Sequence, residues 1–189
     1  PGDRQVPMTS STDFELQPVL AGSLITLRPL KPEDFEALYA AASDPLIWEQ
    51  HPDPERYQRD AFESRVFRGG MESGGAFAII DNSDGRIVGT TRFYEWDPAA
   101  REVAIGYTFL VRSHWGGPVN REMKQLLLDH AFRWAKMVWL HIGENNKRSR
   151  RATEKLGARL SHIEIKGAGA FARPTAFYRI EAEAWQRQA

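Results

Sequence analysis

A short loop with two glycines and a proline stands directly before an amphipathic helical pattern, and its composition suits an anion. The loop is HWGGPVN, residues 114–120. Gly116 and Gly117 let several backbone N–H groups converge and let a ligand approach without meeting a Cβ atom. Pro118 falls near the first helical turn, where its missing N–H matters least. The loop therefore predicts a phosphate or pyrophosphate at a helix N-terminus.

Two other phosphate-binding loops are excluded by the sequence. No Gly-Lys-Ser/Thr follows, as a P-loop requires, and the third glycine of the dinucleotide fingerprint is missing. Taken alone, a tight strand-to-helix turn with glycines for close contact is the simpler interpretation. The residues on either side of the loop favour the ligand site.

The strand pattern before the loop, residues 101–111, has small residues at the middle of one face. Alternation puts Val103, Ile105, Tyr107, Phe109 and Val111 on one side. The other side carries Glu102, Ala104, Gly106, Thr108 and Leu110. A bare strand face that leads into an anion-binding loop would accommodate a long, thin ligand with a phosphate at one end.

Polar residues farther along the chain are placed to contact the same ligand. Asn146 is followed by Ser149 three residues later. Asn146 also has the right chemistry for a helix cap, and Ser149 has an ordinary helical role as its alternative. A basic cluster accompanies them: Arg148, Arg150, Arg151 and Lys155. One or two of these cations would meet a phosphate, and the others would form a solvated face.

The elements that must position these residues follow from hydrophobic periodicity. Strands are expected at 23–30, in a hairpin over 75–96 that turns at Asp84-Gly85, and at 101–111, 137–142, 158–166 and 174–182. Helices are expected over 32–42, from 55 to 68 with an end at Gly69-Gly70, over 118–134, and over 147–156 with an end at Gly157. This order predicts an α+β fold with a mixed sheet covered by helices.

Length and composition set limits on the function. The 189 residues suffice for one domain, expected over 19–189 behind a flexible arm over 1–18. Basic and acidic residues both number 25, so no overall field attracts nucleic acid or an anionic membrane. The chain has no cysteine, which excludes disulfides, thiolate metal sites and a cysteine nucleophile. No apolar run is long enough for a membrane span, and the expected location is the cytoplasm.

The combination of EVAIGYTFL, SHWGGPVNREMKQLLLDHAF and ENNKRSRRATEKLGA resembles the GNAT superfamily of N-acetyltransferases, most closely the branch of ribosomal-protein N-terminal acetyltransferases. The resemblance implies a mostly antiparallel sheet with a V-shaped splay between two strands that admits acetyl-CoA. Acetyl-CoA is then the cosubstrate and no metal is required. One departure is Pro118-Val119, where the family has a second glycine and a small residue, so one amide donor is lost.

The resemblance also assigns residues to the cofactor. The loop residues His114, Trp115, Gly116, Gly117, Val119 and Asn120 would hold the pyrophosphate. Asn146 and Ser149 would contact the pantetheine arm, and Arg151 a phosphate. Backbone N–H groups of Phe109, Leu110 and Val111 would polarise the thioester carbonyl. Many relatives protonate the leaving thiolate with a tyrosine where this chain has Thr153, so Ser149 is the expected donor.

The acceptor and the base are less constrained. Glu102 is the expected carboxylate, although it lies two residues before the usual family position, which Ala104 occupies; Glu95, His114 and His51 are rivals. Trp48, His51 and Tyr94, with Tyr57, would line an aromatic acceptor site, or would simply pack under a loop. An α-amine, with a pKa near 7.7–8.0, needs less base than a lysine side chain near 10.4.

Three functions from different classes remain open on the sequence. The first is acetyl transfer to a primary amine, on a protein, a peptide or a small molecule, by a monomer or homodimer. The second is a catalytically silent acyl-CoA-binding or sensor domain, which the missing tyrosine and the altered loop favour. The third is a plain phosphate- or nucleotide-binding module. Release of free thiol from acetyl-CoA that depends on an amine separates the first from the others.

Overall fold

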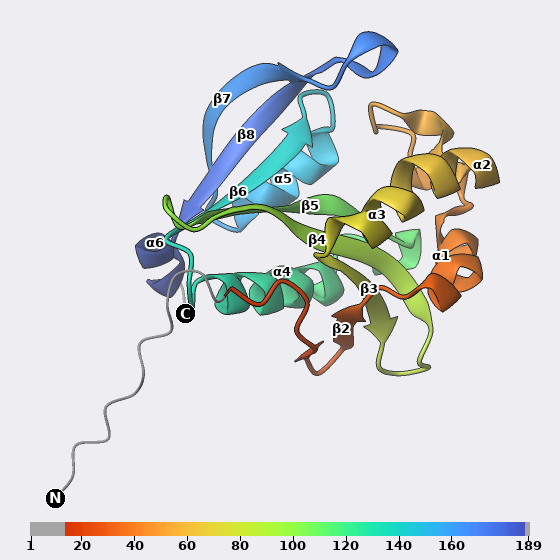
Figure 1. Ribbon diagram of the computed structural model, residues 1–189, viewed down its shortest axis with the longest axis horizontal. Coiled ribbons are helices and arrows are strands. Elements are labelled where there is room, and N and C mark those ends of the chain that lie inside the picture. Colours follow the sequence, from red (N-terminus) through yellow and green to blue (C-terminus); the bar gives the residue numbers. More distant parts are fainter. Residues whose placement is uncertain (1–13, 188–189) are drawn as a thin grey trace, which may run out of the picture.

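The computed structural model describes residues 14–187 and has one mixed sheet at its centre (Figure 1). Eight strands lie in the order β1-β2-β3-β4-β5-β6-β8-β7. Their bounds are β1 Leu20–Ala21, β2 Ile25–Pro29, β3 Ala76–Asp81, β4 Ile87–Asp97, β5 Glu102–Leu110, β6 Met137–Gly143, β7 Arg159–Lys166 and β8 Arg173–Glu181. Neighbouring strands are antiparallel except β5 and β6, which run parallel. The predicted α+β class and mixed sheet are confirmed.

Helices cover the two faces of the sheet in separate groups (Figure 1). Their bounds are α1 Phe35–Ala42, α2 Arg59–Phe62, α3 Arg68–Ser73, α4 Pro118–Ala131, α5 Lys147–Lys155 and α6 Ala182–Gln186. α1 and α2 pack with β3 and the end of β5 in one hydrophobic cluster. α4 packs in a second cluster against the other face of β2 to β6 and β8. We call the face on the side of α1 to α3, where the sequence predicts an acceptor site, the acceptor face.

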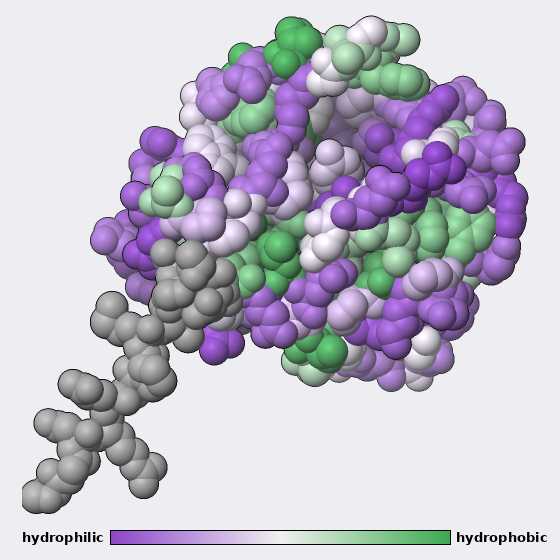
Figure 2. Space-filling view, in the orientation of Figure 1, coloured by the Kyte–Doolittle hydropathy of each residue, from purple (hydrophilic) through white to green (hydrophobic). Residues whose placement is uncertain are grey.

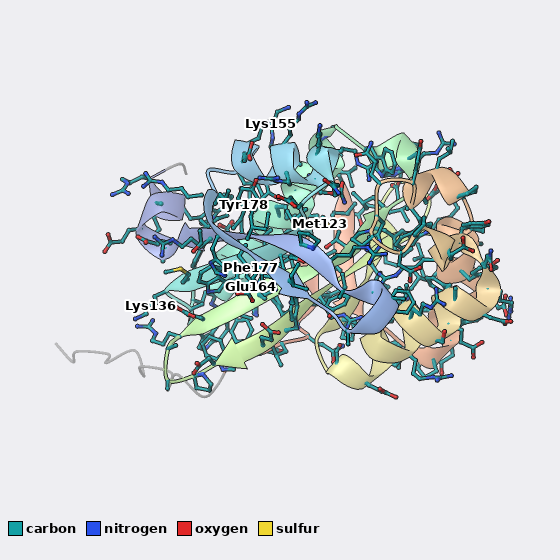
Figure 3. The ribbon with its side chains drawn as sticks, turned by 90° about the horizontal axis from the view of Figure 1, so that it is seen from above. Met123, Lys136, Lys155, Glu164, Phe177 and Tyr178 are labelled. Carbon is teal, nitrogen blue, oxygen red and sulfur yellow. The ribbon has the colours of Figure 1, made fainter. Side chains whose placement is uncertain are left out.

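The C-terminal strands show how alternation divides side chains between these faces. Tyr178 points toward α5, where its hydroxyl donates to the carboxylate of Glu154 at 2.6 Å. Its neighbour Phe177 points to the acceptor face and stacks on the His162 ring, with ring centroids 4.6 Å apart. Seen from above, Phe177 and Glu164 lie together on that face (Figure 3). The acceptor face of β6 to β8 is therefore lined by aromatic and charged residues.

The segment before β1 packs on the sheet from Phe14 onward. The Phe14 ring is buried against Phe93, Trp96 and Trp134, with centroid distances of 4.8 to 5.3 Å. The arm expected over 1–18 is therefore a core element at its last residues, and residues 1–13 lie outside the described part of the chain.

The predicted end of the second helical segment at Gly69-Gly70 was wrong. The helix continues through both glycines to Ser73 and ends at Gly74, which has a left-handed φ of 69°. The helix at these glycines packs against β4, where a Cβ at Gly69 or Gly70 would lie in ordinary contact, 3.7 Å from the Arg92 guanidinium. A π-helical turn over Glu63–Phe67 joins α2 to α3.

A β-bulge in β5 reverses the predicted alternation of that strand. Thr90 pairs with Phe109 and Arg92 with Gly106, so one residue of β4 stands opposite two of β5. Tyr107, within the bulge, has a left-handed φ of 52°. Val103 and Ile105 face α4, whereas Phe109 packs with α1 and α2 on the other face. The two predicted faces of strand 101–111 therefore exchange sides at Tyr107.

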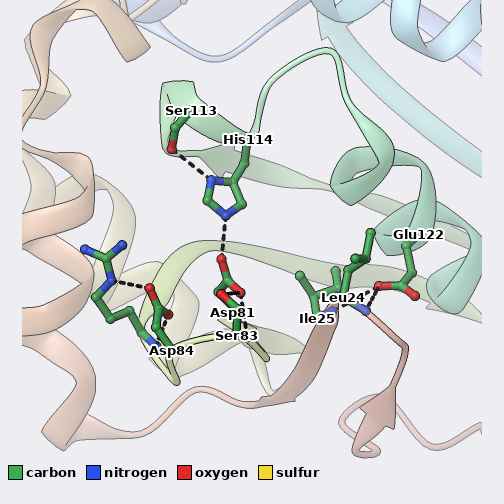
Figure 4. Close-up of polar contacts among 9 residues, drawn as sticks. Leu24, Ile25, Asp81, Ser83, Asp84, Ser113, His114 and Glu122 are labelled. Carbon is green, nitrogen blue, oxygen red and sulfur yellow. Dashed lines mark hydrogen bonds and ion pairs between the residues drawn. The ribbon is translucent and has the colours of Figure 1, made fainter.

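The N-terminal half of α4 is anchored to the first strands by one carboxylate. Glu122 accepts hydrogen bonds from the backbone N–H groups of Ser23, Leu24 and Ile25 at 2.7 to 3.0 Å. Figure 4 shows this carboxylate with Leu24 and Ile25. A Cβ at Gly22 would lie 2.5 Å from this carboxyl carbon, so glycine makes the approach possible. The start of α4 is thereby fixed relative to the sheet.

The other predicted boundaries agree with the structure. The hairpin of β3 and β4 turns at Gly85 with a φ of 74°, and α5 is followed by Gly157 with a φ of 90°. β1 and α6 were not predicted, because two residues and five residues give too little pattern. No helix between residues 14 and 187 has the length and apolar character that a bilayer crossing requires.

Candidate functional site

The parallel strands β5 and β6 separate partway along their length. They pair from Glu102 with Met137 to Ile105 with Leu140, and β6 then continues in register with β8 up to Gly143. The bulge at Tyr107 bends β5 toward β4 at this point. The unpaired ends, 106–110 and 141–143, form a gap that we call the splay. The predicted V-shaped opening is present.

The glycine loop and the start of α4 lie at the wide end of the splay. Gly116 has a left-handed φ of 65°, which explains this glycine. Gly117 is the N-cap of α4, Pro118 is its first residue, and no side chain caps the helix. The N–H groups of Val119 and Asn120 are thus left without a capping side chain, as an anion-binding helix end requires.

Side chains around the loop hold it in place. The Trp115 indole N–H donates to the Leu110 carbonyl at 2.8 Å. The Arg148 guanidinium of α5 lies 3.5 Å from the Trp115 ring centroid, so a cation–π contact joins the two sides of the splay. Arg151 is exposed on α5, whereas Arg150 turns inward and donates to the Tyr178 hydroxyl at 2.9 Å.

His114 points away from the helix end. Its Nε2 lies 2.8 Å from Asp81 at the end of β3, and its Nδ1 lies 2.9 Å from the Ser113 hydroxyl (Figure 4). Hydrogen bonds from Ser83 and then from His114 lower the pKa of Asp81 to about 2. The side chain predicted to contact the cofactor therefore ties the loop to β3.

The backbone donors predicted at the end of β5 are not equivalent. The Val111 N–H donates to the Val88 carbonyl at 2.9 Å, so it is already used by the sheet. Because successive N–H groups of a strand point to opposite sides, the Leu110 N–H is directed away from β4 and toward the splay. The side chains of Phe109 and Leu110 are buried.

The start of α5 brings Asn146 and Ser149 to the other side of the splay. Asn146 is the N-cap of α5, and its Oδ1 accepts from the Ser149 N–H at a long 3.4 Å. The structural alternative for Asn146 is therefore realised, and a long cap bond leaves its amide group weakly held. Ser149 is half-buried, while Thr153 is buried one turn farther along.

Glu102 begins β5, at the end of the strand where β5 and β6 are paired. It precedes Ile105, the last residue of β5 that pairs with β6, by three residues, or about 10 Å along the strand. Its Oε2 accepts from the Trp139 indole N–H at 3.3 Å. It lines a cavity of about 440 Å³ on the acceptor face, together with Glu95, Asp97, Val103, Ala104, Trp139, His141, His162 and Phe177.

The three predicted acceptor residues have different surroundings. Trp48 is only 3% exposed and donates to the Ala42 carbonyl at 2.9 Å, so it packs under its loop. His51 lines a pocket of about 280 Å³ with Pro52, Asp53, Arg56, Arg65 and Phe171. Tyr94 lies over Gly106, whose absent Cβ would be 3.1 Å from its ring. The bare strand face expected at Gly106 is thus covered by Tyr94.

Several residues of the acceptor face were not identified from the sequence. The His141 Nδ1 lies 2.9 Å from the Tyr94 hydroxyl and 2.8 Å from Lys166 Nζ. Because an ammonium only donates, Nδ1 is an acceptor and the ring proton belongs on Nε2. Burial, and then Lys166, lower the pKa of His141 to about 4. Arg92 also belongs to this face, and only its alternation with Tyr94 along β4 signalled it.

We expect His51 to make stability depend on pH. Its Nδ1 accepts from the Asp53 N–H at 2.9 Å, and burial, followed by Arg56, lowers its pKa from 6.5 to about 4. The unfolded chain binds the proton more readily, so stability is complete above pH 6.5 and falls as the pH drops toward 4. The full loss is about 3 kcal/mol by linkage. Chemical unfolding at several pH values measures it.

His51→Asn is the matched control for this prediction. An asparagine oxygen can accept the Asp53 N–H but does not titrate, so the variant should lose less stability between pH 6.5 and 4. Equal slopes for the two proteins would contradict the assignment.

No group of three or more side chains able to hold a metal ion occurs within residues 14–187.

Comparison with known proteins identifies this arrangement. A family model described as an acetyltransferase (GNAT) domain matches residues 25–159. No curated protein matches the sequence significantly. Among solved structures, a GCN5-related N-acetyltransferase from Brucella melitensis superposes with a TM-score of 0.79 at 22% identity, over 90% of this chain and 81% of the other.

Two further solved structures share the fold. The acetyltransferase (GNAT family) from Bacillus anthracis has a TM-score of 0.68 at 19% identity, over 88% of this chain and 99% of the other. Spermidine N-acetyltransferase from Vibrio cholerae, solved with CoA and spermine, has a TM-score of 0.66 at 16% identity, over 87% and 99%. With the splay, the uncapped start of α4 and a family match over most of its length, the chain belongs to the GNAT family of acetyltransferases.

Proposed function

We propose that this acetyltransferase binds acetyl-CoA in the splay and transfers the acetyl group directly to a primary amine held on the acceptor face. The observation that carries the proposal is the position of the uncapped α4 N-terminus at the wide end of the splay. A gap between two strands fits an extended pantetheine chain, and a helix N-terminus fits the pyrophosphate. The gap and the helix N-terminus are adjacent, so one elongated ligand can occupy both.

The loop and α5 would hold the two ends of acetyl-CoA. The N–H groups of Val119 and Asn120 would receive the pyrophosphate oxygens, with Gly116 and Gly117 allowing close approach. Asn146 would donate to the pantetheine arm from the other side of the splay. Arg148 and the exposed Arg151 supply positive charge along the same side.

The residues at the apex of the splay support direct transfer. The amine nitrogen forms a bond to the thioester carbon while the carbon–sulfur bond breaks and the thiolate leaves. The Leu110 N–H, directed toward the splay, would stabilise negative charge on the carbonyl oxygen. The Ser149 hydroxyl would donate a hydrogen bond to the departing sulfur. Holding the amine and the thioester next to each other provides the rest of the rate enhancement.

Neither His141 nor Glu102 is well suited to remove the amine proton at the apex of the splay. His141 is neutral at pH 7, but its pKa near 4 makes it a reluctant proton acceptor. Glu102 lies about 10 Å along β5 from the apex. An amine that is already partly neutral at pH 7 suits such a site, which favours α-amines over lysine side chains.

An acceptor screen with acetyl-CoA tests this function. The purified protein is mixed with acetyl-CoA and one amine at a time, including peptide α-amines, amino acids and spermine, and free thiol is measured. We expect thiol release that depends on one class of amine, with the acetylated product confirmed by mass spectrometry. Binding of CoA without amine-dependent thiol release would instead indicate the sensor domain.

Asn146→Ala should weaken CoA binding by about 1–3 kcal/mol, because it removes a polar contact to a buried ligand. It should also lower the free energy of unfolding by about 0.5–1 kcal/mol, since the cap bond is long at 3.4 Å. Asn146→Asp is the matched control for the cap, because it keeps the capping oxygen while it replaces the amide donor with a charged carboxylate oxygen. Calorimetric titration and chemical unfolding separate the two effects. If Asn146→Asp binds CoA as the parent does, Asn146 is only a cap.

A further inference from the structure

We propose that Arg92 binds a carboxylate of the acceptor, so that the substrates are amines that also carry a carboxylate, such as α-amino acids. This inference rests on the proposed acetyl transfer and specifies its acceptor class. Arg92 is on β4, directly opposite Gly106, the first β5 residue beyond the pairing with β6. A group bound there lies beside the apex of the splay.

Arg92 is a buried cation without an acidic partner in the described residues. It is 8% exposed, and its side chain makes no salt bridge. Its Nη1 donates to the Gly69 carbonyl at 3.2 Å, and its Cζ lies 3.9 Å from the Tyr107 ring centroid. Burial, as the largest cause, lowers its pKa. A guanidinium has five N–H donors, so most of its hydrogen-bonding capacity is left for a ligand.

The guanidinium lies between α3 and the bulge of β5. It packs over Gly69 and Gly70 of α3, and a Cβ at either position would be in ordinary van der Waals contact with it, 3.7 Å away. Tyr107 lies within the bulge and has a left-handed φ of 52°. Its ring covers the side of the guanidinium that faces away from α3. The same bulge bends β5 away from β6 and so opens the splay. One distortion of β5 therefore positions both the ring over Arg92 and the gap for acetyl-CoA.

Other charges next to Arg92 make this part of the acceptor face positive. Arg56 and Arg65 both bind Asp53, at 3.1 Å each, so one carboxylate serves two guanidinium groups. Arg56 is close enough to depress the pKa of Arg92 in addition to burial. Lys166 adds a further cation at His141. The space-filling view shows a hollow between the β7–β8 end and α2–α3 with mostly hydrophilic surroundings (Figure 2).

This charge pattern selects between acceptor classes. A polyamine such as spermine would place several positive charges beside Arg56, Arg92 and Lys166, where like charges repel. A carboxylate would instead neutralise a buried cation, and guanidinium binds carboxylate through two parallel hydrogen bonds. Carboxylates line the neighbouring cavity at Glu95, Asp97 and Glu102. That cavity extends to His141, but Arg56, Arg92 and Lys166 are not among its lining residues.

The test compares each common α-amino acid with the amine that remains when its carboxylate is removed, for example phenylalanine with phenethylamine. Thiol release from acetyl-CoA gives kcat/KM for both members of each pair. Binding of the same compounds to the CoA-bound protein is measured by calorimetry. For at least one pair we expect the acid to be preferred by about 10- to 100-fold, as for a hydrogen bond to a charged group. Arg92→Gln should abolish that preference, and it should change kcat/KM for the decarboxylated amine by less than about threefold.

Three controls define the outcomes. Arg68→Gln removes a charge from the exposed start of α3 and should leave the preference unchanged. Arg92→Lys keeps the charge without the paired donors and should retain part of the preference. Peptides that begin with Asp or Asn and have a free N-terminus and an amidated C-terminus show whether the carboxylate belongs to a free amino acid or to an acidic first residue of a peptide. Melting temperatures confirm that each variant is folded.

Two results would overturn the assignment of Arg92. One is that no acid binds or reacts better than its decarboxylated amine, with spermine as good a substrate as any acid. The other is that Arg92→Gln weakens both members of a pair equally. If acids bind through Arg92 but no thiol is released, the carboxylate site stands and acetyl transfer is wrong.

Discussion

Gly117→Asp should reduce CoA affinity by about 100-fold without destabilising the protein. Gly117 is the N-cap of α4, and its φ of −115° and ψ of −167° suit any residue. An aspartate there would accept from the N–H groups that the pyrophosphate needs and would place a negative charge beside it. Like charges in contact cost several kcal/mol. The midpoint of thermal unfolding, measured with increasing CoA, gives the affinity of each protein.

Gly117→Asn separates charge from size in the same position. Asparagine is also a good N-cap and nearly the same shape, so its CoA affinity should fall less than about tenfold, from competition for the N–H groups alone. Without CoA, both variants should be as stable as the parent or a few tenths of a kcal/mol more stable. Equal stabilisation of Gly117→Asp and the parent by CoA would place the pyrophosphate elsewhere.

Ser149→Ala should lower turnover by about 100-fold while acetyl-CoA affinity changes little. Ser149 lies in the first turn of α5, and its N–H donates to the capping residue Asn146 at the start of that helix. A hydrogen bond to the departing sulfur strengthens as charge develops, so it stabilises the transition state more than the bound substrate. A general acid typically raises the rate by about 10²–10⁴-fold, and a serine, which is a weak acid, should contribute at the low end of that range. Steady-state kcat and calorimetric CoA affinity give the two quantities.

Thr153→Ala is the comparison that identifies the hydroxyl. Thr153 stands where many relatives have a tyrosine, but it is only 3% exposed, one turn deeper than Ser149. Its loss should cost stability rather than turnover. Full turnover in Ser149→Ala together with a loss in Thr153→Ala would show that the wrong hydroxyl was chosen. Full turnover in both would mean that water protonates the sulfur.

The sequence predicted the elements whose patterns are local. The glycine loop, the following helix and the hairpin turn at Asp84-Gly85 agree with the structure, because glycine, proline and apolar spacing act over a few residues. The order of strands and helices sufficed to indicate the family. Asn146 also has its predicted capping contact, since a cap depends on its own helix.

The sequence was least informative for residues whose role depends on a contact with a residue far away in the sequence. Gly69 and Gly70 were taken as a helix end, yet the helix continues through them and packs against Arg92, which lies more than twenty residues away in sequence. The sequence left Trp48 either in an acceptor site or packed under its loop, and it is buried against Phe109 with ring centroids 5.2 Å apart. Glycine and tryptophan each have a local and a packing role, and only the neighbours in space distinguish them.

The sequence by itself determined that a loop able to bind an anion precedes a helix after a strand with a bare face. It did not determine what meets on the acceptor face. The bulge at Tyr107 exchanges the two faces of β5, which alternation alone could not show because one extra residue reverses every side chain after it. Tertiary structure also decided that Arg92, His141 and Lys166 come together there. These residues lie on three separate strands, and only sheet order and register make them neighbours.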